Sequence, residues 1–324
     1  MTEHRVPGAS ATLIRNGKID DHAVLGVGPE TLFQAASISK VVAGQVILRL
    51  ADHAEIDLDR PVNDMLRSWK LLGHQAQAVT PRLLLSHRAG TNVPGFPGYI
   101  HGAPLPSLRE ILSGSPPAIT PPVQVEQEPG RAFLYSGGGT MVLQQLALDV
   151  TGRSFEDLTA DLILTPAGMV RSSFKQPLPP AEQDATTAHD IDGRALPGGG
   201  HVYPELAAAG LWSTAIDLTH LALAISESWR DGGLLSRSLA RTMAQPVGGG
   251  PTGLGIFVHA QNGRPPLLYH YGVNAGFRSV LTFVADGSFG LALMTNGEGG
   301  RPLIPAFCGA LFTSNGQGSF PSID

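Results

Sequence analysis

The stretch TLFQAASISK, residues 31–40, carries the pattern on which the interpretation of this chain depends. From Ser37 to about His53 the apolar residues recur at the spacing of a buried helix. Ser37 and Lys40 are three positions apart, so on a helix they share one face and the amine can reach the hydroxyl. A serine hydroxyl needs a group that takes its proton, and burial can lower the pKa of a lysine enough for that task. The stretch therefore predicts a nucleophile, Ser37, with Lys40 as its proton partner.

The Ser-x-x-Lys pattern also has an ordinary structural explanation. Ser37 as a helix N-cap and Lys40 as a surface side chain with a buried stem would produce the same residues. The pattern arises by chance in many chains of this length, so it does not establish an active site by itself. In the functional alternative, the helix N-terminus would also direct backbone amides toward an oxyanion formed at Ser37.

Strand patterns lie at both ends of the chain. Residues 9–14 and 19–27 are apolar-rich and flank Asn16-Gly17, a pair typical of a tight hairpin turn. Further strands are expected within residues 253–260, 267–270, 276–285 and 289–296. Strands at both ends around a helical middle predict an α+β fold in which the two ends share one antiparallel sheet.

The middle of the chain predicts a second, mostly helical lobe. Short helical patterns separated by Gly and Pro occupy residues 57–165, so we assign residues 1–56 and 166–324 to a sheet lobe. The active site is expected between the two lobes. The stretch from Gly90 to Gly130 is rich in Pro and Gly, and loops of that length in a compact domain usually form functional walls or lids. Tyr99 within it is therefore a candidate pocket residue.

Composition limits the classes of partner. The 324 residues are 42% hydrophobic, which is enough for a large core, and the net charge of -5 argues against nucleic acid or an anionic membrane as the main partner. We expect a small-molecule substrate, no cofactor and no metal, and a cytoplasmic location, because the first residues lack a signal-peptide pattern. The single cysteine, Cys308, excludes an internal disulfide.

Three further motifs follow the Ser-x-x-Lys stretch in order. They are LLLSHRAG (residues 83–90), EPG (128–130) with FLYSG (133–137), and HYG (270–272) with GFRS (276–279). Together with residues 31–40, their order and spacing resemble class C beta-lactamase-like serine hydrolases of the penicillin-binding-protein superfamily. The resemblance runs from about Val6 to Asn296. Four motifs in order are far more specific than any one of them.

The resemblance implies a beta-lactamase/transpeptidase-like fold and a set of roles. Ser37 would be the acylated nucleophile, Lys40 its proton partner, and Tyr135 the residue that passes a proton to the leaving group and later activates the acceptor. The backbone amides of Ser37 and Val273 would form the oxyanion hole. Whether lysine or tyrosine is the formal base is disputed in this superfamily, so we assign Lys40 and Tyr135 jointly.

Two positions depart from the family pattern. Gly137 stands where the second motif usually has asparagine, and His270 with Gly272 stands where the third usually has Lys-Thr-Gly. The resemblance implies that all three contact the substrate. Histidine is less cationic at pH 7, hence a poorer anchor for a substrate carboxylate. The glycine run after Tyr135 is expected to interrupt helix and to widen the room near the nucleophile. Tyr203, before a run of small residues, is a second candidate pocket wall.

These departures favour an esterase or amidase, or an acyltransferase that uses an amine or alcohol acceptor, over a true beta-lactamase. A D-amino-acid peptidase or weak beta-lactamase is the alternative within the superfamily. A catalytically inactive ligand-binding module of the same fold is the alternative from another class. The joint presence of Ser37, Lys40 and Tyr135 favours the enzyme.

Overall fold

A computed structural model describes residues 4–182, 184–316 and 320–321, and its centre is a six-stranded sheet. All neighbouring strands in it are antiparallel, in the order β2-β1-β12-β11-β10-β9. The strands are β1 Ala9–Arg15, β2 Lys18–Leu25, β9 Phe257–Gln261, β10 Arg264–Asn274, β11 Phe277–Val284 and β12 Phe289–Thr295. The two ends of the chain thus build one sheet, and the α+β prediction is confirmed.

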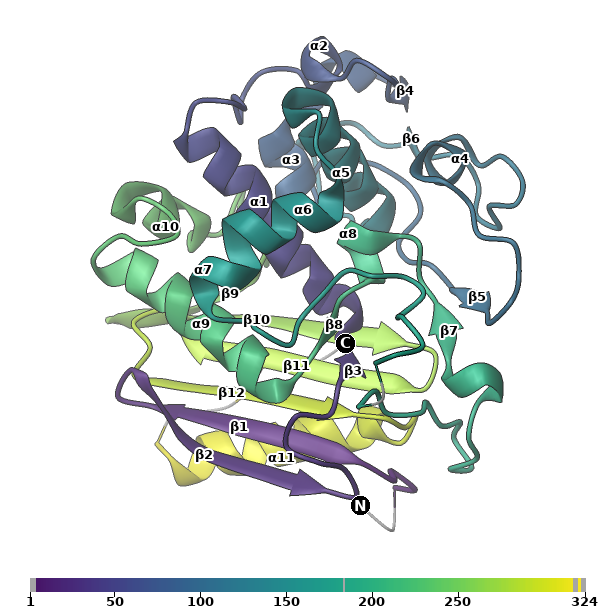
Figure 1. Ribbon diagram of the computed structural model, residues 1–324. Helices are drawn as coiled ribbons and strands as arrows, with labels where there is room; N and C mark the ends of the chain where they lie inside the picture. Colours follow the sequence, from purple (N-terminus) through teal and green to yellow (C-terminus); the bar gives the residue numbers. More distant parts are fainter. Residues whose placement is uncertain (1–3, 183, 317–319, 322–324) are drawn as a thin grey trace.

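Helices cover both faces of this sheet (Figure 1). On one face α9, Ala215–Arg230, packs on β1, β11 and β12, while α11, Gly300–Ser314, packs on β11 from the other face. Every residue of β12 is buried, whereas the edge strand β2, with the sequence KIDDHAVL, is mostly exposed. Central strands therefore carry continuous apolar runs because both of their faces are covered.

The remaining helices gather around α1, Ser39–Asp52, on the side of the sheet away from α11 (Figure 1). They are α2 Val62–Met65, α3 Pro81–Leu85, α4 Leu108–Ser113, α5 Gly137–Thr151, α6 Phe155–Thr159, α7 Thr165–Ala167, α8 Leu206–Ala209 and α10 Arg237–Met243. Paired short strands tie the loops together: β3 Phe33–Gln34 with β8 Trp212–Ser213, β4 Leu72–Gly73 with β6 Gln124–Val125, and β5 Tyr99–Ile100 with β7 His201–Val202.

Local turn chemistry agrees with the sequence in most places. Asn16 and Gly17 both have positive φ between β1 and β2, as expected of that pair. The glycine run after Tyr135 behaves differently from the prediction. Gly137, Gly138 and Gly139 form the first turn of α5, with Ser136 as N-cap accepting a hydrogen bond from the Gly139 amide at 2.9 Å. The cap and the packing of the run outweigh the low helix propensity of glycine.

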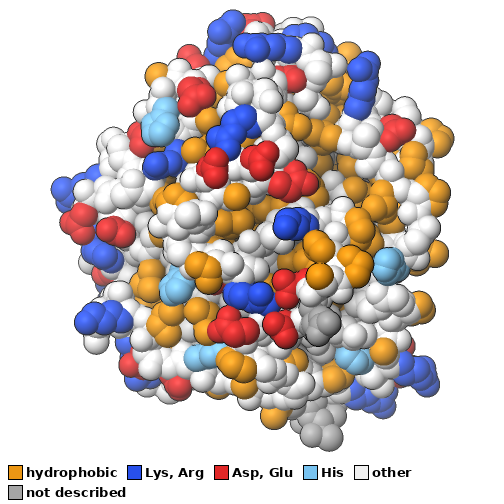
Figure 2. Space-filling view, in the orientation of Figure 1, with side chains coloured by type: hydrophobic (Ala, Val, Ile, Leu, Met, Phe, Trp, Pro, Cys, Tyr) orange, Lys and Arg blue, Asp and Glu red, His pale blue; other side chains and the backbone are white. Residues whose placement is uncertain are grey.

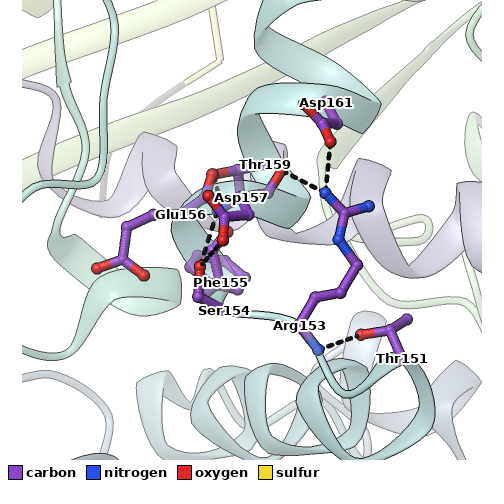
Figure 3. A network of polar contacts seen from close by, with 8 residues as sticks. All are labelled: Thr151, Arg153, Ser154, Phe155, Glu156, Asp157, Thr159 and Asp161. Atoms are coloured by element: carbon purple, nitrogen blue, oxygen red, sulfur yellow. Dashed lines mark hydrogen bonds and ion pairs between the residues drawn. The ribbon is translucent and has the colours of Figure 1, made fainter.

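The connection from α5 to α6 is a network of short polar contacts (Figure 3). Gly152 ends α5 in the left-handed conformation, which glycine adopts without a Cβ penalty. Ser154 caps α6 by accepting from the Asp157 amide at 3.1 Å, and Arg153 forms an ion pair with Asp161 in the following π turn, Ala160–Leu164. The network fixes the turn between α5 and α6, both of which contact α1.

One hydrophobic cluster runs through the molecule from the sheet, at Ile14 and Met294, into the helices, at Leu112 and Leu146. The division at residues 56 and 166 therefore stays a prediction. On the face drawn in Figure 2, acidic and basic side chains are interspersed, consistent with a modest net charge of -5. Within the described residues no helix is both long and apolar enough to cross a bilayer.

Candidate active site

Ser37 lies in a 3-10 turn, Ala36–Ile38, between β3 and α1. Ala36 has φ of 52°, a left-handed conformation that costs a non-glycine residue energy and persists only when its surroundings hold it. The surroundings do so through Ala35, whose amide donates to Leu211 O at 2.8 Å and whose carbonyl accepts from Ser279 Oγ at 2.9 Å. The turn that presents Ser37 is thus fastened to the sheet.

Gly272 of β10 also packs against the backbone of this turn. A Cβ added there would lie 2.2 Å from Ala35 O and 2.1 Å from Ser279 Oγ, far inside van der Waals contact. Only glycine lets the strand pass this close to the backbone before Ser37. Gly272 was predicted to touch substrate; in the structure it packs against the nucleophile turn, outside the residues that line the cavity beside Ser37.

Lys40 is directed at Ser37 from the first turn of α1. Its Nζ lies 2.9 Å from Ser37 Oγ and donates to Ala208 O at 2.7 Å. The side chain is buried, and desolvation lowers its pKa from 10.5 to about 7. A large fraction of the molecules therefore carries a neutral amine at neutral pH. With one N–H given to Ala208, the lone pair of that amine is available to the Ser37 hydroxyl.

Tyr135 comes from the loop before α5 and meets both residues. Burial raises the pKa of its phenol to about 12, and a hydrogen bond with the Ser37 side chain lowers it by a smaller amount. The Lys40 Nζ lies 5.2 Å from the centroid of the ring. Tyr135 consequently keeps its proton at neutral pH and can donate it at the nucleophile.

Two histidines flank Tyr135, and both are buried. His87 lies with its ring centroid 4.5 Å from that of Tyr135, and its Nδ1 accepts from the Ser136 amide at 3.2 Å. Desolvation lowers the pKa of His87 well below 6.5 and that of His270 to about 3. Repulsion from the Lys40 charge is the second, smaller cause for both. His270 is therefore neutral and offers no cation to a substrate.

A cavity of about 740 Å³ opens beside Ser37, Lys40 and Tyr135. Val273 is 61% exposed on its wall. The other side chains of the wall are mostly apolar. The lining consists of Ser37, Lys40, Pro94, Gly95, Phe96, Pro97, Phe133, Tyr135, Ala208, Ala209, Phe257, His270, Tyr271, Val273 and Asn274. The structure thus brings together the predicted Ser37, Lys40, Tyr135, His270 and Val273.

Three other predicted pocket residues are not among those that line this cavity. Tyr99 is buried, with its hydroxyl accepting from the Ile119 amide at 3.2 Å, and Tyr203 is buried, with its hydroxyl accepting from the Ala275 amide at 2.9 Å. Gly137 adds no open room. A Cβ there would lie 3.0 Å from Phe96 Cε2, because the Phe96 ring occupies the space that the expected widening would have needed.

Sequence reasoning missed Ala208, Phe96 and Asn274. Ala208 acts through a backbone carbonyl, which no residue type signals. Asn274 donates from Nδ2 to Gln34 Oε1 at 2.8 Å and to Ala209 O at 3.2 Å, and its place two residues after Gly272 on the same strand face could have indicated it. Among the described residues no group of three His, Cys, Asp or Glu side chains could hold a metal ion.

Comparisons with known proteins identify relatives of this chain. The family described as Beta-lactamase matches residues 1–305. Penicillin-binding protein 4 of Amycolatopsis lactamdurans is 28% identical over 53% of this chain and 45% of its own length. A putative penicillin-binding protein, PbpX, of Bacillus subtilis (strain 168) is 24% identical over 89% of this chain and 70% of its own length. The chain thus spans less than half of the first relative and about two thirds of the second.

Solved structures extend the likeness to the fold. The octameric penicillin-binding protein homologue from Pyrococcus abyssi superposes with a TM-score of 0.82 at 24% identity, covering 98% of this chain and 75% of that one. A D-stereospecific amidohydrolase from Streptomyces sp. superposes with a TM-score of 0.76 at 21% identity, covering 95% and 96%. The fold is therefore that of the beta-lactamase and penicillin-binding-protein group.

Proposed function

This chain belongs to the Beta-lactamase family, and on that premise we propose that it is a serine hydrolase or acyltransferase that acts on a neutral, apolar ester or amide. The observation that carries the proposal is the 2.9 Å contact between Lys40 Nζ and Ser37 Oγ, made by a lysine whose pKa burial lowers to about 7. A neutral amine at that distance is within reach of the serine proton.

The first half of the reaction acylates Ser37. Its Oγ attacks the substrate carbonyl carbon while its proton passes to the Lys40 amine, directly or through the Tyr135 phenol. The backbone amides of Ser37 and Val273 receive the oxyanion; both residues line the same cavity. As the bond to the leaving group breaks, Tyr135 gives that group a proton and is reprotonated by the Lys40 ammonium.

The second half releases the acyl group. Water, or an amine or alcohol in its place, attacks the acyl carbon and passes a proton to the neutral Lys40 amine through Tyr135. Ser37 then leaves with a proton returned from the same pair. No net proton is lost from Ser37, Lys40 and Tyr135, so one set of side chains serves both halves. The choice of water or another acceptor depends on what enters the cavity.

The neutral character of the site supports the substrate class. His270 has a pKa of about 3, and much of the Lys40 population has lost its charge at neutral pH. A substrate carboxylate would find no permanent cation at these two positions. The apolar side chains of Phe96, Phe133 and Phe257 instead favour a substrate whose groups are uncharged. A cytoplasmic location remains part of the proposal.

Intact-mass measurement tests the acyl-enzyme. Wild-type protein should gain one adduct with a fluorophosphonate and turn over p-nitrophenyl esters, while Ser37→Ala should form no adduct and lose at least about 10³-fold in turnover. Ser39→Ala is a poor control because Ser39 Oγ donates to Ala36 O, but the exposed Ser314→Ala is a suitable one. Undiminished turnover in Ser37→Ala would overturn the assignment.

The same measurement separates the alternatives. A stable penicillin adduct together with weak ester turnover would favour a D-amino-acid peptidase or weak beta-lactamase over an esterase or acyltransferase. Absence of every adduct on a folded protein, with a penicillin or ester still shifting its melting temperature, would favour a binding module. The fluorophosphonate arm thus decides between enzyme and module, and the penicillin arm decides between substrate classes.

A further inference from the structure

The beginning of α5 is occupied by a loop of the same chain. Ser136 Oγ donates to Asn92 O at 2.6 Å, the Gly138 amide donates to Val93 O at 2.9 Å, and the Gly137 amide donates to Pro94 O at 3.1 Å. These first amides of a helix are otherwise free to bind a ligand or water. Here two of these amides and the Ser136 hydroxyl hold residues 92–94 against the helix end, directly beside Tyr135.

The other end of this loop is held as firmly. Pro97 O lies 2.9 Å from His201 Nδ1 and accepts from Tyr203 OH at 3.3 Å. Gly98 has φ of 72°, and a Cβ there would lie 2.5 Å from the Tyr203 ring, so only glycine fits between the loop and that ring. The buried Tyr203 therefore supports the cavity wall from behind.

Phe96 lies between the two anchors. Its Cε2 and Cδ2 atoms lie 3.0 and 3.4 Å from the position of a Cβ at Gly137, and its side chain lines the cavity beside Ser37. Gly137 has no positive φ, so its backbone would accept another residue. The Phe96 ring and the Pro94 carbonyl oxygen, 3.3 Å from that Cβ, are the obstacles to a side chain at this position, and the ring is the one that a substitution can remove.

We propose that Phe96 is the specificity-determining residue of the Ser37 site: held by its two loop anchors, it takes the space of a side chain at position 137 and presents an apolar surface to the substrate. Pro94, Gly95 and Pro97 carry no polar side-chain atoms, and the carbonyls of Pro94 and Pro97 already accept hydrogen bonds. The wall formed by residues 94–97 therefore suits an apolar substituent, and the Phe96 ring limits the space that this substituent can fill. This inference rests on the proposed function.

Two series of p-nitrophenyl and alkyl esters, one varied in the acyl group and one in the alcohol, measure the preference. Phe96→Ala should raise kcat/KM for branched or aromatic substituents relative to short linear ones by roughly tenfold or more in at least one series, since one methylene group in an apolar pocket changes kcat/KM by at least about that factor. Phe307→Ala, an exposed phenylalanine of α11 outside this lining, is the matched control and should not change the preference.

A double-mutant cycle tests the steric part without relying on turnover. Gly137→Asn should lower the melting temperature in wild type and lower it less in Phe96→Ala. In the Phe307→Ala background it should lower the melting temperature as much as in wild type. Equal costs in all three backgrounds, or unchanged ester preference in a Phe96→Ala enzyme that still takes fluorophosphonate, would overturn the inference alone. Failure of the wild type to take fluorophosphonate would overturn the proposed function, while the stability cycle would still report on the packing.

Discussion

The beginnings of α1 and α5 supply the two halves of the candidate catalytic group, and they are held in different ways. The turn before α1 is pressed onto the sheet, with Gly272 admitting contact between β10 and the Ala35 backbone. The first turn of α5 is held by the carbonyls of a loop, and the space beside Gly137 is filled by a side chain, Phe96. Backbone contact cannot be altered without moving Ser37. A side-chain filler can be exchanged, so the α5 end is where selectivity can change while the chemistry is kept.

The largest expected effect comes from breaking the α1 side. Gly272→Ala places a Cβ 2.2 Å from Ala35 O, which must push β10 or the Ser37 turn away. Misplacement of reacting groups by about 1 Å costs on the order of 100-fold, so we expect kcat/KM to fall by at least about that factor. Steady-state kinetics with a p-nitrophenyl ester measures it.

Gly309→Ala in α11 is the matched control for that variant. Nothing lies within 4 Å of its added Cβ, and alanine in a helix interior is better than glycine by roughly 1 kcal/mol. It should keep full turnover and melt slightly higher. Wild-type kinetics in Gly272→Ala would show that the sheet does not hold the nucleophile turn.

The second effect concerns the proton acceptor on the α1 side. Neutral Lys40 is the active form, and its pKa is about 7, so the rate of acylation should rise about tenfold per pH unit below 7 and level off above it. The rate of labelling by a fluorophosphonate from pH 5 to 9 measures this profile without interference from an ionising substrate.

His270→Gln should retain the same rising limb, because a histidine with a pKa of about 3 does not titrate in that range. Loss of the limb in this variant would transfer the role of proton acceptor from Lys40 to His270. A flat profile in wild type would contradict a lysine base altogether.

The smallest effect on turnover is expected at α8, which contacts both α1 and α5. α8 accepts from Lys40 through Ala208 O and donates to Gln144 of α5 through the Ala207 amide at 3.0 Å. Before it stands Glu205, fully buried, with no hydrogen bond from another described residue to its carboxylate oxygens. Desolvation raises the pKa of Glu205 from 4.5 to about 7.

Glu205 should therefore make stability depend on pH. Between pH 4.5 and 7 the folded protein binds more protons at this group than the unfolded chain does, so its contribution falls as pH rises, by about 3 kcal/mol in all. Urea unfolding of Glu205→Gln should lack this loss, while Glu227→Gln on an exposed part of α9 should keep it. A wild-type curve identical to that of Glu205→Gln would contradict a buried, unpaired carboxylate.

Much of the fold was predictable because it depends on local patterns. The hairpin at Asn16-Gly17, the strands of residues 253–296 and the buried helix after Ser37 follow from turn residues and from apolar periodicity. The glycine run at 137–139 was predicted to interrupt helix, but it is helical. Its helical state depends on the Ser136 cap and on loop carbonyls that accept hydrogen bonds from its amides. The carbonyls of Val93 and Pro94 belong to a loop more than 40 residues earlier in the chain.

The sequence by itself determined which chemistry was available: a serine and a lysine three residues apart at the head of an apolar helix, a tyrosine motif, and a histidine where a lysine is usual. Only the tertiary structure decided how these groups ionise and what surrounds them. The pKa of Lys40 near 7, the neutrality of His270 and the Phe96 ring over Gly137 come from burial by distant segments. Desolvation and steric exclusion depend on every atom nearby, whereas a motif records only the residues within it.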